Sequence, residues 1–231
     1  MAAGHVSGLL RRAGWWAADY AYAGLGQLRA TTRRRSARDF QDGRLAPIVV
    51  IPGVYESWRF LTPLVVALHD RGHPVHVVEP LRHNRRPFGE GAEIVARLLE
   101  ERDLHDVVLV AHSKGGLIGK RMMSATAAAS RVRGMVAIAT PFGGSRYARF
   151  LAVPTLHAFS PRNAAILALA RETEVNRRIV SVYARFDPHI PEGSELPGAR
   201  NVVIETGGHF RVLAHPRVIA EVAAFSEPSP G

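Results

Sequence analysis

The stretch Val107-Val-Leu-Val-Ala-His-Ser-Lys-Gly-Gly116 is the strongest indication of the fold. Its first four residues are aliphatic, which is typical of a strand buried on both faces of a parallel sheet. A segment that favours a helix follows from Leu117 to Ala129. Ala111 and Gly115, two positions on either side of Ser113, are small enough for a sharp turn between strand and helix. The stretch therefore predicts a strand, a tight turn that carries Ser113, and a helix.

Strands and helices alternate on both sides of this stretch. We expect further strands at 47–51, 75–78, 132–139, 179–183 and 201–204, and helices at 57–69, 90–102, 163–172 and 212–225. This alternation predicts an α/β fold, with a mainly parallel central sheet flanked by helices. Functional residues of such sheets gather beyond the carboxyl ends of the strands.

The length of 231 residues, of which 47% are hydrophobic, suits one α/β domain. We place this domain at residues 46–226. Within it, residues 141–176 interrupt the alternation with Gly, Pro and short helical pieces, which predicts a small lid or cap. Residues 227–231 form a Pro/Ser tail that we expect to be disordered.

Residues 1–45 precede the domain as a basic, aromatic helical segment and a connector. Residues 1–44 hold eight Arg against three Asp, a net charge of +5, which is half of the +10 of the whole chain. The helix either packs its aromatic side chains on the domain or contacts an anionic membrane peripherally. An Arg-rich composition on a solvated surface is a third reading. We expect no nucleic-acid partner, because no binding module accompanies the charge.

Several chemical classes are excluded or not expected. The chain has no Cys, so disulfides, thiolate metal sites and a cysteine nucleophile are excluded. The histidines between His69 and His83 lack ligand spacing, and we expect no metal. Gly24-Leu-Gly26 lacks the third glycine and the preceding strand of a dinucleotide site, so we expect no cofactor. The sequence also lacks an apolar run of roughly 18 residues and a secretory pattern, which predicts a cytoplasmic protein.

Two segments resemble a known family. Val110-Ala-His-Ser-Lys-Gly-Gly116 is similar to the nucleophile elbow of α/β-hydrolase lipases and esterases, with Ala111 where a glycine is usual. Thr140-Pro-Phe-Gly-Gly-Ser145 resembles the T-P-x-x-G-S segment of bacterial lipases and related acyl hydrolases. The resemblance runs from about residue 46 to residue 225. It implies the α/β-hydrolase fold and a catalytic triad in the order Ser, acid, His.

Asp187 and His209 follow Ser113 in that order. Asp187 ends the segment 179–187, where a strand would deliver a carboxylate to the carboxyl edge of the sheet. It could instead begin an Asp-Pro turn. His209 follows Gly207 and Gly208 between the last strand and the last helix, where a solvated turn residue is the alternative. We predict that Asp187 orients His209 and that His209 takes the proton of Ser113.

The resemblance also implies two backbone N–H donors for the oxyanion of an acyl transfer. One is Lys114, directly after the nucleophile. The other is Val54, in Ile51-Pro-Gly-Val54 after the first predicted strand. Many relatives have His-Gly here, whereas this chain has Pro52-Gly53.

Together these features predict a serine hydrolase of the lipase or esterase type that cleaves a small-molecule or lipid carboxylic ester. Two alternatives stay open. An acyltransferase or thioesterase would use the same triad with another acceptor or substrate. A non-catalytic binding protein could also be built on this fold.

Overall fold

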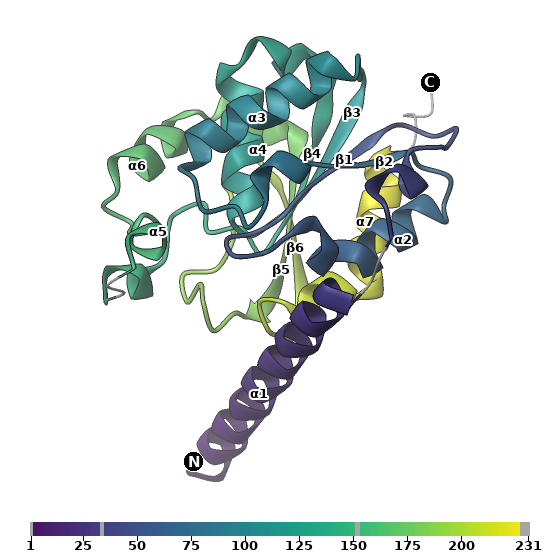
Figure 1. Cartoon of the computed structure of the whole chain (residues 1–231). Coiled ribbons are helices and arrows are strands. Elements are labelled where there is room, and N and C mark those ends of the chain that lie inside the picture. The colour runs from purple at the N-terminus through teal and green to yellow at the C-terminus, as the bar shows by residue number, and fades with distance from the viewer. Residues whose placement is uncertain (1, 33–34, 151–152, 227–231) are drawn as a thin grey trace.

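The computed structural model describes residues 2–32, 35–150 and 153–226 (Figure 1). Within these residues, six strands form one sheet in the order β2-β1-β3-β4-β5-β6. The strands are β1 (Ile48–Ile51), β2 (Val75–Val77), β3 (Val107–His112), β4 (Val132–Ile138), β5 (Ile179–Phe186) and β6 (Arg200–Gly207). Every neighbouring pair is parallel. The predicted α/β fold is confirmed, and the sheet is wholly rather than mainly parallel.

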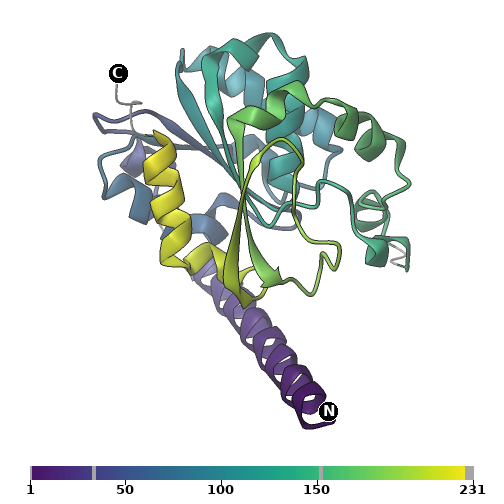
Figure 2. The ribbon, with the colours of Figure 1, turned by 180° about the vertical axis from the view of Figure 1, so that it is seen from behind.

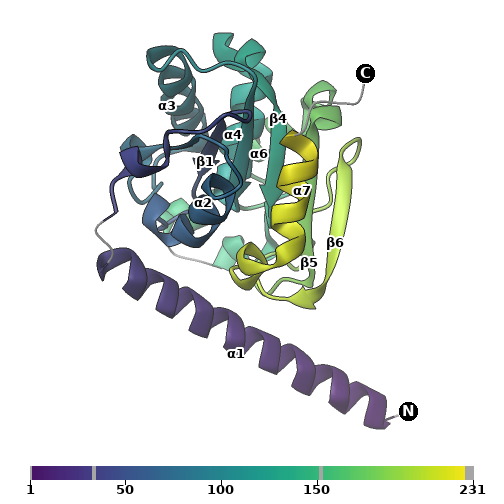
Figure 3. The same cartoon turned by 90° about the vertical axis from the view of Figure 1, so that its right-hand side faces the viewer.

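Helices cover both faces of the sheet (Figures 1 and 3). One face carries α3 (Phe88–Glu101) and α4 (Lys114–Ala125), and the other carries α2 (Thr62–His69) and α7 (Pro216–Ser226). Successive side chains of a strand point to opposite faces. Val108 of β3 therefore joins the core beside α2 and α7, whereas Leu109 joins the core beside α3 and α4.

Shorter elements connect these layers. They are α5 (Pro154–His157), α6 (Ala164–Arg171), η1 (Ala37–Phe40), η2 (Trp58–Leu61), η3 (Glu79–Leu81), η4 (Ala127–Arg131), η5 (Arg146–Phe150), η6 (Glu174–Arg178) and η7 (Arg211–Ala214), where η marks a 3-10 turn. The predicted lid segment at 141–176 contains η5, α5 and α6. Ile166 and Leu169 of α6 are buried in the same core as α4. The predicted disorder of residues 227–231 lies outside the described residues.

Three predicted helix boundaries were wrong. The helix after Ser113 begins at Lys114 rather than Leu117, because the turn leads directly into it. The helix expected at 57–69 is divided into η2 and α2. The helix expected at 212–225 is divided into η7 and α7, because Pro216 fits the first turn of a helix but cannot continue one.

The N-terminal segment forms one long helix, α1 (Ala2–Thr32), which lies across the carboxyl ends of the strands (Figure 3). Its N-terminal end projects beyond the rest of the molecule (Figure 2). Trp15 stacks on Phe186, at a ring distance of 6.2 Å, and Tyr22 meets Phe60 edge-on. No helix in the described part of the chain has both the length and the apolar character needed to cross a bilayer. The cytoplasmic location stays a prediction.

Gly115 allows α4 to approach β1 closely. A Cβ atom at Gly115 would overlap the carbonyl oxygen of Ile51, which belongs to the backbone and cannot rotate away. We expect Gly115→Ala to lower the free energy of unfolding by about 1–3 kcal/mol, the usual cost of overpacking. Urea denaturation measures this change. The matched control is Gly89→Ala in α3, where a Cβ atom meets nothing within 4 Å and no loss is expected. Equal stability of the two variants would contradict the prediction.

Candidate active site

Ser113 lies at the turn between β3 and α4, at the carboxyl edge of the sheet. Its backbone has φ 51° and ψ −119°, a conformation that residues with a side chain rarely adopt. Packing on both sides holds this conformation. Gly115 lies against Ile51 of β1, and Gly116 lies so close to Thr140 that a Cβ atom would overlap its side chain. The turn raises the Ser113 hydroxyl above the strand ends.

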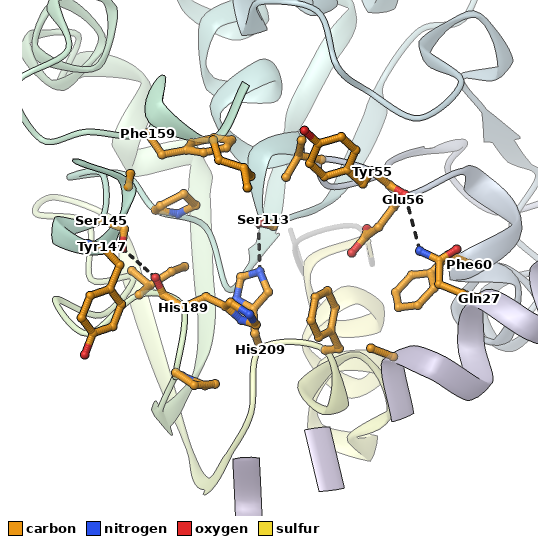
Figure 4. Close-up of a pocket in the computed structure, with 18 residues that line it drawn as sticks. Gln27, Tyr55, Glu56, Phe60, Ser113, Ser145, Tyr147, Phe159, His189 and His209 are labelled. Carbon is orange, nitrogen blue, oxygen red and sulfur yellow. Dashed lines mark hydrogen bonds between the residues drawn. The ribbon is translucent and has the colours of Figure 1, made fainter. Parts of the chain in front are cut away.

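The structure brings together the three residues that the sequence predicts to act as a triad. The His209 Nε2 atom lies 3.0 Å from Ser113 Oγ (Figure 4). The His209 Nδ1 atom lies 2.7 Å from Asp187 Oδ2. All three residues are buried. They follow β3, β5 and β6, which end at the same edge because the strands are parallel.

Asp187 makes a turn and contacts His209 at the same time. Its Oδ1 atom accepts hydrogen bonds from the backbone N–H groups of His189 and Ile190, at 2.7 and 3.1 Å. Its Oδ2 atom remains for His209. The turn reading and the triad reading of Asp187 are therefore compatible. The turn fixes the carboxylate in the orientation that the imidazole needs.

Opposite charges shape the pKa values of this pair. Burial by itself would raise the pKa of Asp187, but the His209 imidazole and the His189 N–H outweigh it, and the pKa is lowered. Burial would lower the pKa of His209, but the Asp187 carboxylate, with smaller contributions from Glu56 and Asp19, outweighs it, and the pKa is raised. The site therefore stabilises the imidazolium that forms when His209 accepts a proton.

The backbone N–H groups of Val54 and Lys114 are the two predicted oxyanion donors. Val54 lies in the loop after β1 and lines the pocket, and Lys114 is the first residue of α4. Neither backbone N–H has an acceptor among the residues that the structure describes. The preceding N–H, of Gly53, is already occupied, since it donates to Glu56 Oε2 at 2.7 Å.

The side chain of Lys114 contacts the loop at residues 84–86. Its Nζ atom donates to the carbonyl oxygens of Asn84, at 2.7 Å, and of Arg86. Burial lowers the pKa of Lys114 to about 8. The ammonium group thus anchors the 84–86 loop beside the turn at Ser113.

Sequence reasoning missed a buried pair formed by Glu56 and His112. The carboxylate of Glu56 lies 2.9 Å from His112 Nδ1 and also accepts the N–H of Gly53. His112 Nε2 donates to the carbonyl oxygen of His209 at 3.1 Å. The pair therefore links the loop after β1, the nucleophile turn and the His209 loop. The sequence gives no periodic signal for a carboxylate in an irregular loop, so Glu56 could not be found from its pattern.

Sequence reasoning also placed α1 outside the site, whereas the helix forms part of it. Asp19 is fully buried and accepts the backbone N–H of His209 at 2.9 Å. The Tyr20 hydroxyl lies 2.9 Å from His189 Nε2. Further along α1, Ala23 and Gln27 line the pocket. The one available signal was that Asp19 is the only acidic residue among the first 38.

His189 packs beside the triad. Its ring meets that of His209 at a centroid distance of 4.9 Å, and burial together with the charge of His209 lowers its pKa to about 4. Among the described residues, Asp187, His189 and His209 are the one group that could offer three ligand atoms to a metal, within 4.8 Å of one another. Two of these residues already bond to each other. A metal here would compete with the Asp187–His209 hydrogen bond.

A pocket of about 400 Å³ opens over Ser113 and His209 (Figure 4). Most of its lining is carbon. The lining includes Ala23 of α1, Phe60 of η2, Tyr147 of η5, Leu156 of α5, Phe159 and Ile190. Helix α1, the loop after β1 and the 141–176 segment therefore all contribute to its walls. The site is an apolar pocket that is lined by Ser113, the His209 imidazole and Val54.

No protein-family model matches the sequence, and a comparison with curated proteins finds no match. Solved structures do resemble the fold. The mature lipase BlEst2 of Bacillus licheniformis has a TM-score of 0.63 at 14% identity, over 85% of this chain and 95% of that one. A monoacylglycerol lipase of Paleococcus ferrophilus has a TM-score of 0.56 at 16% identity, over 78% and 96% of the two chains.

Another similar structure is the naproxen esterase of Bacillus subtilis, with a TM-score of 0.56 at 12% identity, over 80% of this chain and 86% of that one. Identities this low establish the fold alone. The strand order, the turn at Ser113 and these likenesses agree, and the chain has the α/β-hydrolase fold.

Proposed function

We propose that the protein is a serine esterase that cleaves carboxylic esters through an acyl-enzyme. The observation that carries this proposal is the unbroken contact from Ser113 Oγ through His209 to Asp187, at 3.0 and 2.7 Å. Both distances are within the reach that proton transfer requires. The lipases and esterases that share the fold support hydrolase chemistry at the level of the fold.

The reaction follows from this arrangement. Ser113 Oγ attacks the ester carbonyl carbon while its proton moves to His209 Nε2. The carbonyl oxygen becomes an oxyanion, which the N–H groups of Val54 and Lys114 bind, and Asp187 stabilises the imidazolium. The leaving alcohol takes the proton from His209. Water then gives a proton to His209 as it attacks the acyl-serine carbonyl. The bond from that carbon to Ser113 Oγ breaks, the acid leaves, and His209 returns the proton to Ser113 Oγ.

The pocket indicates the class of substrate. Its walls are mainly aliphatic and aromatic and include Phe60, Phe159 and Ile190. Among the described residues that line the pocket, Glu56 is the only Asp, Glu, Lys or Arg. Glu56 is already engaged with Gly53 and His112. We infer an ester with an apolar acyl or alcohol part, because burying that part removes apolar surface from water.

Ser113→Ala tests the proposal. We expect wild-type protein to hydrolyse p-nitrophenyl esters and to be labelled by a fluorophosphonate probe. The variant should lose labelling and about 10⁴- to 10⁶-fold in kcat, because the nucleophile is gone. Ser124→Ala, at the far end of α4, is the matched control and should behave as wild type. Undiminished labelling of Ser113→Ala would refute the assignment, and ester formation with added alcohol would identify an acyltransferase.

Glu56→Gln tests the support of the oxyanion loop. Gln has the size of Glu but carries one acceptor oxygen, so either the Gly53 N–H or His112 loses a charged partner. We expect kcat to fall about tenfold to hundredfold, as for loss of a charge-assisted hydrogen bond. Steady-state kinetics measure the effect. Glu79→Gln, at an exposed position in η3, is the control. A kcat for Glu56→Gln within twofold of the control would contradict this role.

We further propose that the outer side of α1 contacts anionic membranes. Leu10 and Leu25 are 69% and 53% exposed on this helix. Residues 1–44 carry a net charge of +5, and a positive charge favours an anionic lipid surface. Arg11 also lies over the ring of Trp15, at 5.0 Å, an arrangement that holds its charge close to the helix.

The double variant Leu10→Ser/Leu25→Ser tests membrane contact. We expect its binding to phosphatidylglycerol vesicles to fall at least tenfold in co-sedimentation, because two apolar side chains no longer leave water. Added salt should weaken wild-type binding. Leu167→Ser on α6, also an exposed leucine (48%), is the control. If both variants bind as wild type does, α1 is not the contact.

A further inference from the structure

The loop that carries His209 is held by a helix from the opposite end of the sequence. The Asp19 carboxylate of α1 accepts three backbone N–H groups in succession. Its Oδ2 atom accepts that of His209 at 2.9 Å. Its Oδ1 atom accepts those of Phe210 and Arg211, both at 2.8 Å. A single side chain therefore fixes three consecutive peptide groups beside the proposed general base.

The loop is shaped to receive this carboxylate. Gly208 has φ +127°, a region that disfavours a side chain, and a Cβ atom there would overlap the Asp19 carboxylate. Asp19 has no exposed surface. A buried carboxylate is costly unless hydrogen bonds replace its hydration, and the three N–H groups supply them.

Attachment of α1 does not by itself account for Asp19. The helix also packs through Trp15, which stacks on Phe186 and covers Gly207, and through Tyr22 on Phe60. An apolar side chain of similar volume would anchor the helix without burying a charge. Asp19 therefore contributes something that packing cannot, namely acceptors aimed at the backbone of one loop.

We propose that Asp19 is a positioning residue of the active site, which fixes the His209 loop so that Nε2 meets the Ser113 hydroxyl. This inference rests on the proposed esterase function. The opposite side of the same residue is held too, because the His209 carbonyl oxygen accepts from His112 Nε2 at 3.1 Å. The backbone N–H and C=O of His209 are thus both held, and Asp187 holds its ring through Nδ1. The imidazole is therefore preorganised for proton transfer.

The charge of Asp19 gives its role a measurable signature. Among the residues that the structure describes, five charged or titratable side chains face His209: Asp19 from α1, Glu56 from the loop after β1, His112 from β3, and Asp187 and His189 after β5. Burial lowers the pKa of His209, whereas Asp187, Glu56 and Asp19 raise it. Removing the negative charge of Asp19 should lower this pKa. The neutral, basic form of His209 would then persist to lower pH.

Asp19→Asn tests the inference in the full-length chain with p-nitrophenyl esters. Asn keeps the size of Asp but offers one acceptor oxygen to three N–H groups. We expect kcat to fall about tenfold to hundredfold with KM nearly unchanged, as for loss of charge-assisted hydrogen bonds. The acidic limb of the pH profile of kcat/KM should move to lower pH. Asp70→Asn, at an exposed position after α2, is the matched control and should change neither quantity.

Asp19→Glu separates position from charge, and circular dichroism verifies that each variant is folded. Glu keeps the charge but displaces the carboxylate, so kcat should fall while the acidic limb stays where wild type has it. If Asp19→Asn does not fold, a lower kcat together with an unmoved acidic limb in Asp19→Glu supports the inference. Wild-type kcat and an unmoved limb in the folded variants would overturn the inference. Failure of the wild-type enzyme to react with a fluorophosphonate would instead overturn the proposed esterase function.

Discussion

Burial of negative charge around one imidazole is the constraint on which the site depends. Asp19, Glu56 and Asp187 are all buried and all lie near His209. Each carboxylate would be costly in a dry interior without hydrogen-bond donors. The donors are backbone N–H groups of the loops that the site uses, including those of Gly53, His189 and His209. Satisfying the carboxylates therefore also fixes these loops.

The parallel sheet makes this convergence possible. Because all six strands run in one direction, the loops after β1, β3, β5 and β6 reach the same edge. The strained conformation of Ser113 also depends on close packing at this edge. Its φ of 51° is maintained by close packing of α4 on β1 and on Thr140, not by a local sequence preference. Close packing of Gly115 and Gly116, directly after Ser113, thus holds the turn that carries the hydroxyl.

The sequence was sufficient for the sheet and for expecting Ser113, Asp187 and His209 at one edge of it, because the signals are local. An aliphatic run such as Val107–Val110 predicts a strand, and Ser113, Asp187 and His209 each follow such a run. Glu56 and Asp19 carry no signal of this kind. Their importance comes from which N–H groups they meet across 56 and 190 residues of sequence. Such contacts depend on tertiary structure, and pattern reasoning therefore assigned α1 to a separate segment. The predicted bounds of some helices were wrong for a local reason, because the turn at Ser113 and the proline at position 216 determine where a helix begins.

Helix α1 takes part in both proposals, the positioning of His209 and the contact with a membrane. Its inner side presents Asp19 to the His209 loop, and its outer side presents Leu10 and Leu25 to solvent. A partner that binds the outer side changes the position of His209 only if it binds the docked helix and the displaced helix with different affinities. A partner that prefers the docked helix stabilises the hydrogen bonds of Asp19, whereas one that prefers a displaced helix weakens them. Because the same helix also forms a wall of the pocket through Ala23 and Gln27, displacement would alter substrate binding as well as the base. The proposed contact at the outer side and the proposed catalysis would therefore be thermodynamically linked through one helix, in whichever direction the affinities differ.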